Sequence, residues 1–262
     1  MAGEPDLTAA CAAAYAHPAV RWLLGGDLHP GGARTTRRAL ELISLRPGEA
    51  LLDVASGYGS SALLAAREFG CLVSGVDYSA EVAAEAQTSA EAEGLCDRVG
   101  FIRGDCASLP FADGSFDAVL CECSLSAFPD QARALGEIHR VLRPGGRVAI
   151  SDVTATRERL PGVLRNALAA VACVAGALSV SGYERLLSDA GFDLIATERR
   201  DDDAASMAER ITDRLSGARL LGYGRFSVGG FEVDDAFALS AVAQRAIDEG
   251  SLGYAIFAGA RR

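Results

Sequence analysis

The chain has 262 residues, half of them hydrophobic, and a formal net charge of −10 at neutral pH. That length holds one large α/β domain or two small ones, with an ample core in either case. The acidic balance argues against a polyanionic partner such as nucleic acid, because no basic patch offsets it.

Three sequence features bear on location. The first six residues are acidic and no apolar segment follows them, so we expect no secretory signal. The most apolar run, 167–180, is shorter than the roughly 20 residues that span a bilayer. Seven cysteines at irregular spacing do not form a secreted disulfide framework. We therefore expect a cytoplasmic protein with a small-molecule partner and no nucleic-acid or membrane partner; the sequence leaves the oligomeric state open.

The first part of the chain, 1–48, is predicted to form an N-terminal helical lid. Helices are expected at 7–16 and 19–24, followed by a cluster of helix-breaking residues at 27–32. A further helix should begin at Thr35 or Thr36 and end near residue 45.

From residue 49, short β-type runs alternate with helical ones. Strands are predicted at 51–54, 72–76, 99–102, 116–120 and 147–150, and helices at 61–69, 80–93 and 130–142. This alternation predicts a parallel sheet with right-handed crossovers and helices on both faces.

Beyond Asp152 the order is less regular. Helical insertions at about 157–180 and 201–250 are expected to cap a domain that spans 49–262. Between and after them the pattern predicts a helix at 182–190 and strands at 192–197 and 252–258.

The most informative stretch is a glycine loop that follows the first predicted strand. The strand ends in a carboxylate, Asp53, and the chain then passes through two closely spaced glycines into a helix. Open α/β sheets bind nucleotide-like ligands at such a turn, because glycine lets the ligand approach the backbone. Asp53 either touches that ligand or orients the loop. The candidate cofactor-binding residues of this stretch are Asp53, Ala55, Ser56, Gly57 and Gly59.

Further candidates follow the next strands, at the same edge of the predicted sheet. Asp77 can accept hydrogen bonds from ribose hydroxyls or serve only as a helix N-cap. Asp105 can accept from an adenine amino group or be a simple loop acid. With their neighbours, the additional candidate cofactor-binding residues are Asp77, Tyr78, Gly104, Asp105, Cys106 and Cys121.

These segments, with the turn Arg143-Pro144-Gly145-Gly146, resemble the class I S-adenosylmethionine-dependent methyltransferases over about residues 50–152. The resemblance implies a doubly wound, mostly parallel, seven-stranded Rossmann-like sheet with a helical cap. It implies S-adenosylmethionine as cofactor and S-adenosylhomocysteine as product. Ala55 and Ser61 replace the outer glycines that the family usually has. A dinucleotide dehydrogenase fits less well, since Ala62 stands where its third glycine belongs.

For the methyl acceptor, the cysteines are informative. Cys121 and Cys123 are two residues apart, so they point the same way if the strand continues. Around Cys123 and Cys173 the chain resembles the arsenite S-adenosylmethionine methyltransferases, which bind arsenic at two such positions. The resemblance implies catalytic roles for these two thiols, because soft thiolates hold soft trivalent arsenic. Cys121 is a candidate third ligand for such a metalloid substrate, and no resident metal site is expected.

Other interpretations remain. The chain lacks the family's cysteines just upstream of the glycine loop and its C-terminal extension, and Cys11 is the only upstream thiol. Cys123 and Cys173 are otherwise small buried hydrophobes, as is expected of Cys71, Cys96 and Cys106. A methyltransferase for oxygen, nitrogen or carbon would need a base, for which the candidates are Glu122, His29 and Tyr183. A non-catalytic S-adenosylmethionine-binding module is the third possibility.

Overall fold

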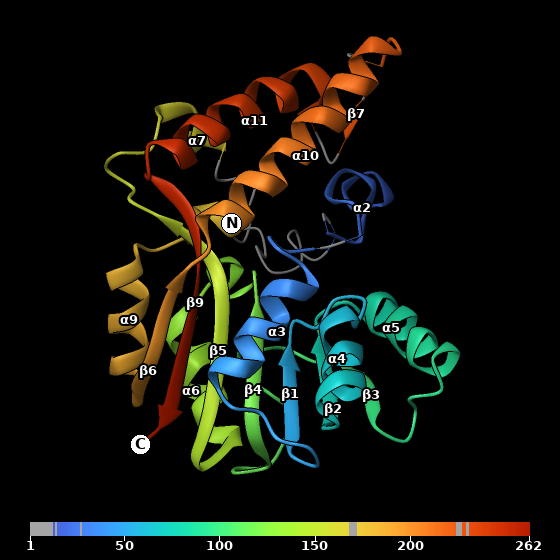
Figure 1. The fold of residues 1–262 in the computed structure, drawn as a ribbon, viewed down its shortest axis with the longest axis vertical. Coiled ribbons are helices and arrows are strands. Elements are labelled where there is room, and N and C mark those ends of the chain that lie inside the picture. The colour runs from blue at the N-terminus through green and yellow to red at the C-terminus, as the bar shows by residue number, and fades with distance from the viewer. Residues whose placement is uncertain (1–12, 14, 27, 168–171, 224–226, 229–230) are drawn as a thin grey trace, which may run out of the picture.

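A computed structural model describes residues 13, 15–26, 28–167, 172–223, 227–228 and 231–262. A seven-stranded sheet with the order β3-β2-β1-β4-β5-β9-β6 forms its centre (Figure 1). Its strands are β1 (Ala50–Val54), β2 (Leu72–Asp77), β3 (Val99–Arg103), β4 (Phe116–Glu122), β5 (Leu142–Ala155), β6 (Phe192–Arg199) and β9 (Leu252–Arg261).

The sheet is mostly parallel, as predicted. β1 to β5 pair in parallel, and β9 runs antiparallel to both β5 and β6. The strand order reverses between β1 and β4, and open α/β sheets bind ligands at such a switch point, outside the carboxyl ends of the strands. The topology therefore directs attention to the loops after β1 and β4.

Helices cover both faces of the sheet because successive strand residues alternate between the faces. Leu51 and Leu120 pack in a core with α3 (Ala33–Leu42) and α4 (Ser60–Leu64). Leu52 and Val119 pack in the core on the other side. The helices that supply this second core are α6 (Gln131–Val141) and α9 (Val180–Asp189). α5 (Ala80–Ala92) joins β2 to β3.

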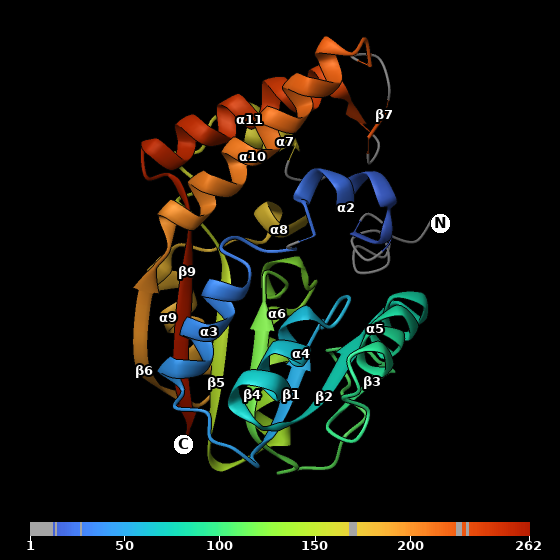
Figure 2. The same ribbon diagram turned by 45° about the vertical axis from the view of Figure 1, so that its right-hand side comes forward.

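A second helical layer lies beyond the carboxyl ends of the parallel strands (Figure 2). In it α10 and α11 pack against each other, and α10 also contacts α2. The elements of this layer are α2 (Pro18–Leu24), α7 (Gly162–Ala167), α8 (Ala172–Ala175), α10 (Asp201–Leu220), α11 (Val233–Asp248) and the hairpin β7 (Ser227–Val228) and β8 (Phe231–Glu232). No helix of the described part of the chain is long and apolar enough to span a membrane.

The structure departs from the predicted elements in three places. The single helix expected at 61–69 is α4 followed by a π-helical turn, Ala65–Phe69. β5 is much longer than predicted, because antiparallel pairing with β9 extends it to Ala155. The apolar run near 160–180 forms two short helices, with 168–171 outside the described residues. Most of the helix expected at 7–16 also lies outside them.

Candidate active site

The loop after β1 turns by means of left-handed backbone at three residues. The φ angles are +57° at Ala55, +53° at Gly57 and +82° at Gly59. A Cβ atom on Gly59 would also overlap the Phe101 ring, so this glycine is required for both conformation and space. Ala55 adopts the same region with a side chain, at a cost of about 1 kcal/mol. The substituted loop therefore keeps the conformation that glycines favour.

Two buried polar atoms, one at the end of β1 and one in this loop, have no hydrogen-bond partner among the described residues. They are Oδ2 of Asp53 and Oγ of Ser56. Asp53 accepts a hydrogen bond from the backbone of Ala62, which supports the interpretation that it orients the loop. Burial, with the nearby Glu122 and Asp77 carboxylates, raises the pKa of Asp53 well above its ordinary value. The unpartnered atoms fit a cationic, hydrogen-bonding ligand such as the aminoacyl end of S-adenosylmethionine.

Asp77, at the end of β2, is joined to the same loop. Its carboxylate accepts hydrogen bonds from the backbone N–H of Gly57 and of Ser79, both at 2.9 Å. The N-cap of α5 is Ser79, whose side chain accepts from Val82, so Asp77 is not that cap. Burial raises the pKa of Asp77 despite these bonds. Tyr78 follows it as a half-buried residue.

The candidates after β3 form a tight turn. Gly104 packs so closely that a Cβ atom there would lie 2.5 Å from Val76. Asp105 is exposed and accepts from the backbone of Ala107 at 2.8 Å, a local turn that is compatible with either predicted role. Cys106 is half-buried, and burial and the Asp105 carboxylate raise the pKa of its thiol to about 12.

Cys121 and Cys123 diverge at the end of β4. The strand ends at Glu122, and Cys123 has a left-handed backbone with φ of +48°. The strand therefore does not continue through Cys123, which was the condition for the two thiols to point the same way. Cys121 is fully buried in the core, with its Sγ atom 3.1 Å from Oγ of Ser124. This position disfavours both roles predicted for Cys121, as a cofactor contact and as a third metalloid ligand.

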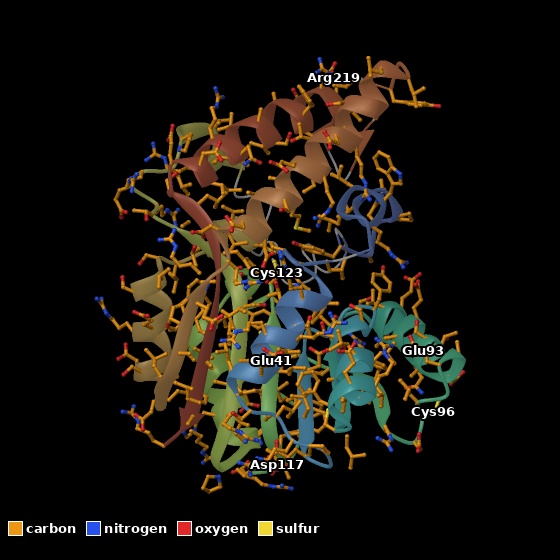
Figure 3. All side chains as sticks on the ribbon, viewed as in Figure 1. Glu41, Glu93, Cys96, Asp117, Cys123 and Arg219 are labelled. Carbon is orange, nitrogen blue, oxygen red and sulfur yellow. The ribbon has the colours of Figure 1, made fainter. Side chains whose placement is uncertain are left out.

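Cys173, from the distant helix α8, lies against Cys123. Its Sγ atom is 3.5 Å from the carbonyl oxygen of Cys123, and a hydrogen bond between the two thiols is the largest cause that raises the pKa of Cys123. The hydroxyl of Tyr15 is 2.8 Å from Sγ of Cys173. α8 approaches closely because Gly176 has no side chain: a Cβ atom there would overlap the carbonyl oxygen of Ser126. Figure 3 shows Cys123 between the sheet and the helical layer.

A buried polar network joins Glu122 to His29, two of the candidate bases, and adds Ser61 and Thr36, whose part in it was not predicted. The carboxylate of Glu122 accepts hydrogen bonds from Ser61 at 2.6 Å and Thr36 at 3.0 Å. Nε2 of His29 lies 3.5 Å from it, and Nδ1 of His29 is 3.3 Å from the carbonyl oxygen of Pro30. Ser61 stands where the family usually has glycine, and its hydroxyl links the loop to β4. The departure at Ser61 and the candidate bases Glu122 and His29 were the signals of the network in the sequence, but their proximity was not predicted.

Asp152, at the carboxyl end of β5, was also missed as a neighbour of the thiol pair. It is fully buried and accepts hydrogen bonds from the backbone and hydroxyl of Ser126 and the backbone of Val153. Burial, followed by the charge of Cys173, raises the pKa of Asp152 to about 7. The carboxylate therefore changes protonation near neutral pH, beside Cys173.

The titration of Asp152 predicts a pH-dependent stability difference for Asp152→Asn. A carboxyl group with a raised pKa in the folded state stabilises the fold below about pH 4, and that contribution is lost as the pH rises to about 7. The amide does not titrate, so its fixed hydrogen-bonding cost is independent of pH. From pH 5 to pH 8 the unfolding free energy of the variant should rise relative to the parent by about 2–3 kcal/mol. Urea denaturation of both proteins at the two pH values measures this; a constant difference would contradict the raised pKa.

The remaining candidates from the sequence have ordinary positions. Cys71 is buried, as expected, but Cys96 is exposed near the α5 edge of the molecule, so the expectation for it was wrong (Figure 3). Cys96 lies in the turn between α5 and β3, where no core residue is required. Tyr183 is buried and donates its hydroxyl proton to the carbonyl of Val153, which disfavours it as a base.

Comparison with known proteins agrees with the fold and the loop. A model of a methyltransferase domain family matches residues 52–150. The chain is 34% identical over 242 residues to an arsenite methyltransferase of Aquipseudomonas alcaligenes, covering 86% of this chain and 68% of that one. It is 42% identical over 129 residues to a demethylmenaquinone methyltransferase of Thermus thermophilus, covering 49% and 56%.

Coverage and structural similarity extend the comparison. The chain spans between 46% and 66% of the length of several curated relatives. One of these is an arsenite methyltransferase of Halobacterium salinarum, which is 35% identical over 180 residues, or 68% of this chain. Among solved structures, phosphoethanolamine N-methyltransferase 2 of Haemonchus contortus with S-adenosylmethionine superposes with a TM-score of 0.77 at 23% identity, covering 93% of this chain and 56% of that one. The glycine loop, the acid after β2, the sheet order and these similarities lead to one conclusion: the chain belongs to the class I S-adenosylmethionine-dependent methyltransferases.

Proposed function

We propose that the protein transfers the methyl group of S-adenosylmethionine to a small soft nucleophile, trivalent arsenic, held by the thiols of Cys123 and Cys173. One observation carries the acceptor part of the proposal. Two thiols that are 50 residues apart in sequence meet beside the end of β4, next to the network that joins Glu122 to the cofactor loop. The arsenite methyltransferases among its relatives are consistent with this acceptor.

The proposed cofactor site is built from the loop and the strand ends. Asp77 would accept from the ribose hydroxyls, the unpartnered oxygens of Asp53 and Ser56 would hold the aminoacyl end, and Asp105 would accept from the adenine amino group. Ala55, Gly57, Gly59 and Gly104 keep the backbone close, with Tyr78 and Cys106 beside it. When bound, the cofactor supplies an electrophilic methyl group on a sulfonium sulfur.

The two thiols then hold and orient the nucleophile. Each thiol proton combines with a hydroxide of arsenous acid, so two water molecules leave as two As–S bonds form. Arsenic keeps its lone pair, so no base would be required to activate it, and catalysis would depend on positioning. The cofactor would supply the methyl group: as the As–C bond forms, the C–S bond of the sulfonium breaks and S-adenosylhomocysteine leaves. The arsenic would then carry four substituents and a positive charge, and a solution thiol such as glutathione would supply the two electrons that return it to the trivalent state. Trivalent arsenic has three substituents, and the two protein thiols supply two of them. The third position can therefore hold a methyl group or a thiolate from solution.

A second candidate function is methylation of an oxygen, nitrogen or carbon atom. The contact between His29 and Glu122, beside Cys123, favours it, because such an acceptor loses a proton and a buried histidine–carboxylate pair can accept one. Binding of the cofactor without turnover would instead favour a non-catalytic module.

The test is a methylation assay with isotopically labelled S-adenosylmethionine and excess glutathione. Arsenite and monomethylarsenite are offered in parallel with small phenol, amine and quinol acceptors. Methylated arsenic as the only labelled product supports the proposal. Label in an oxygen, nitrogen or carbon acceptor alone would reject it in favour of the second function, and calorimetry with S-adenosylmethionine reports whether the cofactor binds at all.

A further inference from the structure

Helix α2 is held in place by polar contacts. It has seven residues, and none of them is buried. At its carboxyl end, Arg214 of α10 donates hydrogen bonds to the carbonyl oxygens of Trp22 and, at 2.9 Å, Leu23. The position of a helix without a buried face depends on such polar contacts rather than on a core.

A second attachment of α2 is to the cofactor loop itself. The guanidinium of Arg21 lies 3.7 Å from the centre of the Tyr58 ring, and Nη1 is 3.1 Å from Oε2 of Glu85. Tyr58 stands between the two loop glycines, and Glu85 belongs to α5, the helix that follows Asp77. One side chain of α2 therefore holds both the loop that binds the cofactor and the helix beside its ribose acid.

The segment after α2 continues this cover. Leu28 packs closely on the loop: a Cβ atom placed on Gly57 would lie 3.0 Å from Cδ1 of Leu28. Figure 2 shows α2 between the carboxyl ends of the strands and the outer helices α10 and α11. α2 therefore lies on the side from which a ligand reaches the loop.

We propose that Arg21, Tyr58 and Glu85 form a latch that holds α2 over the cofactor loop, and that its opening controls entry of S-adenosylmethionine and exit of S-adenosylhomocysteine. The inference rests on the cofactor part of the proposed function and is independent of the acceptor. Arg21 is a positioning residue, because it acts through Tyr58 and α5.

The chemistry of the latch suits repeated opening. The side chains of Arg21 and Glu85 are 44% and 50% exposed, so their ion pair is weak and is screened by salt. The planar guanidinium also stacks on the Tyr58 ring, a contact that a lysine ammonium makes less well. Removing a gate accelerates passage in both directions, whereas removing a direct ligand contact accelerates release alone.

The test measures the rates of S-adenosylhomocysteine binding and release by stopped-flow fluorescence. Trp22 is the only tryptophan of the chain and lies next to Arg21, so it reports on α2 directly. Arg21→Ala should raise both the association and the dissociation rate about tenfold, which corresponds to about 1.4 kcal/mol, and leave Kd within about threefold. Arg21→Lys, which keeps the ion pair but loses the stacking, should lie between.

Two controls make the outcome specific. Arg37→Ala removes a comparably exposed ion pair, with Glu68, away from α2, and should leave both rates unchanged. High salt should accelerate both rates in the parent and much less in Arg21→Ala. Rates within twofold of the parent in Arg21→Ala, or faster release alone, would overturn the latch while leaving the cofactor function intact. Absence of S-adenosylhomocysteine binding by the parent would overturn both.

Discussion

Cys123→Ser and Cys173→Ser should each lower the rate of arsenic methylation about 100-fold or more, with S-adenosylmethionine affinity within about threefold of the parent. A serine hydroxyl is a hard donor and holds soft trivalent arsenic poorly, so the nucleophile is no longer positioned. The affinity should persist because the proposed cofactor contacts of Asp53, Ser56 and Asp77 come from β1, β2 and the loop between β1 and α4. Product analysis by separation of methylated arsenicals gives the rate, and calorimetry gives the affinity.

The matched control is Cys96→Ser, which changes an exposed thiol outside the site and should leave activity unchanged. Alanine variants of Cys123 and Cys173 check that the serine hydroxyl itself does no harm. Full activity in both serine variants would reject the thiol mechanism. Strong loss with a phenol or amine acceptor, but not with arsenic, in Glu122→Gln would instead assign the reaction to the polar network.

Gly59→Ala is expected to destabilise the fold by about 2–5 kcal/mol and to weaken S-adenosylmethionine binding strongly. The alanine must adopt a φ of +82°, which costs about 1–2 kcal/mol, and its methyl group overlaps the Phe101 ring, which adds about 1–3 kcal/mol of overpacking. Relief of the overlap moves either the ring or the loop to which we assign the cofactor contacts. Urea denaturation and calorimetry measure the two effects.

Gly48→Ala separates these two causes. Gly48 has almost the same φ, +81°, but a Cβ atom there meets nothing within 4 Å, so only the conformational cost of about 1–2 kcal/mol should appear. Adding Phe101→Leu to Gly59→Ala should recover most of the remaining difference. Equal destabilisation by Gly48→Ala and Gly59→Ala would show that the ring does not limit this position.

The sequence by itself determined the fold class and the position of the glycine loop after β1. Alternating strand and helix patterns are local, and glycine and aspartate that recur at the ends of successive strands are typical of the ligand-binding edge of an open α/β sheet. The family comparison and the seven-stranded sheet confirm the fold class. The bounds of α4 and β5 were less accurate, because a π-helical turn and pairing with the last strand depend on packing and not on local propensity.

Only the tertiary structure decided which side chains share the proposed acceptor region. Cys123 and Cys173 meet because α8 folds back onto the end of β4, and Gly176 permits that approach; sequence spacing contains no such distance. Cys121 is directed into the core by strand alternation, which ends when Cys123 adopts a left-handed backbone. The contacts of Asp152, Glu122 and Arg21 join elements far apart in the chain, so burial and charge at these residues follow from the fold alone.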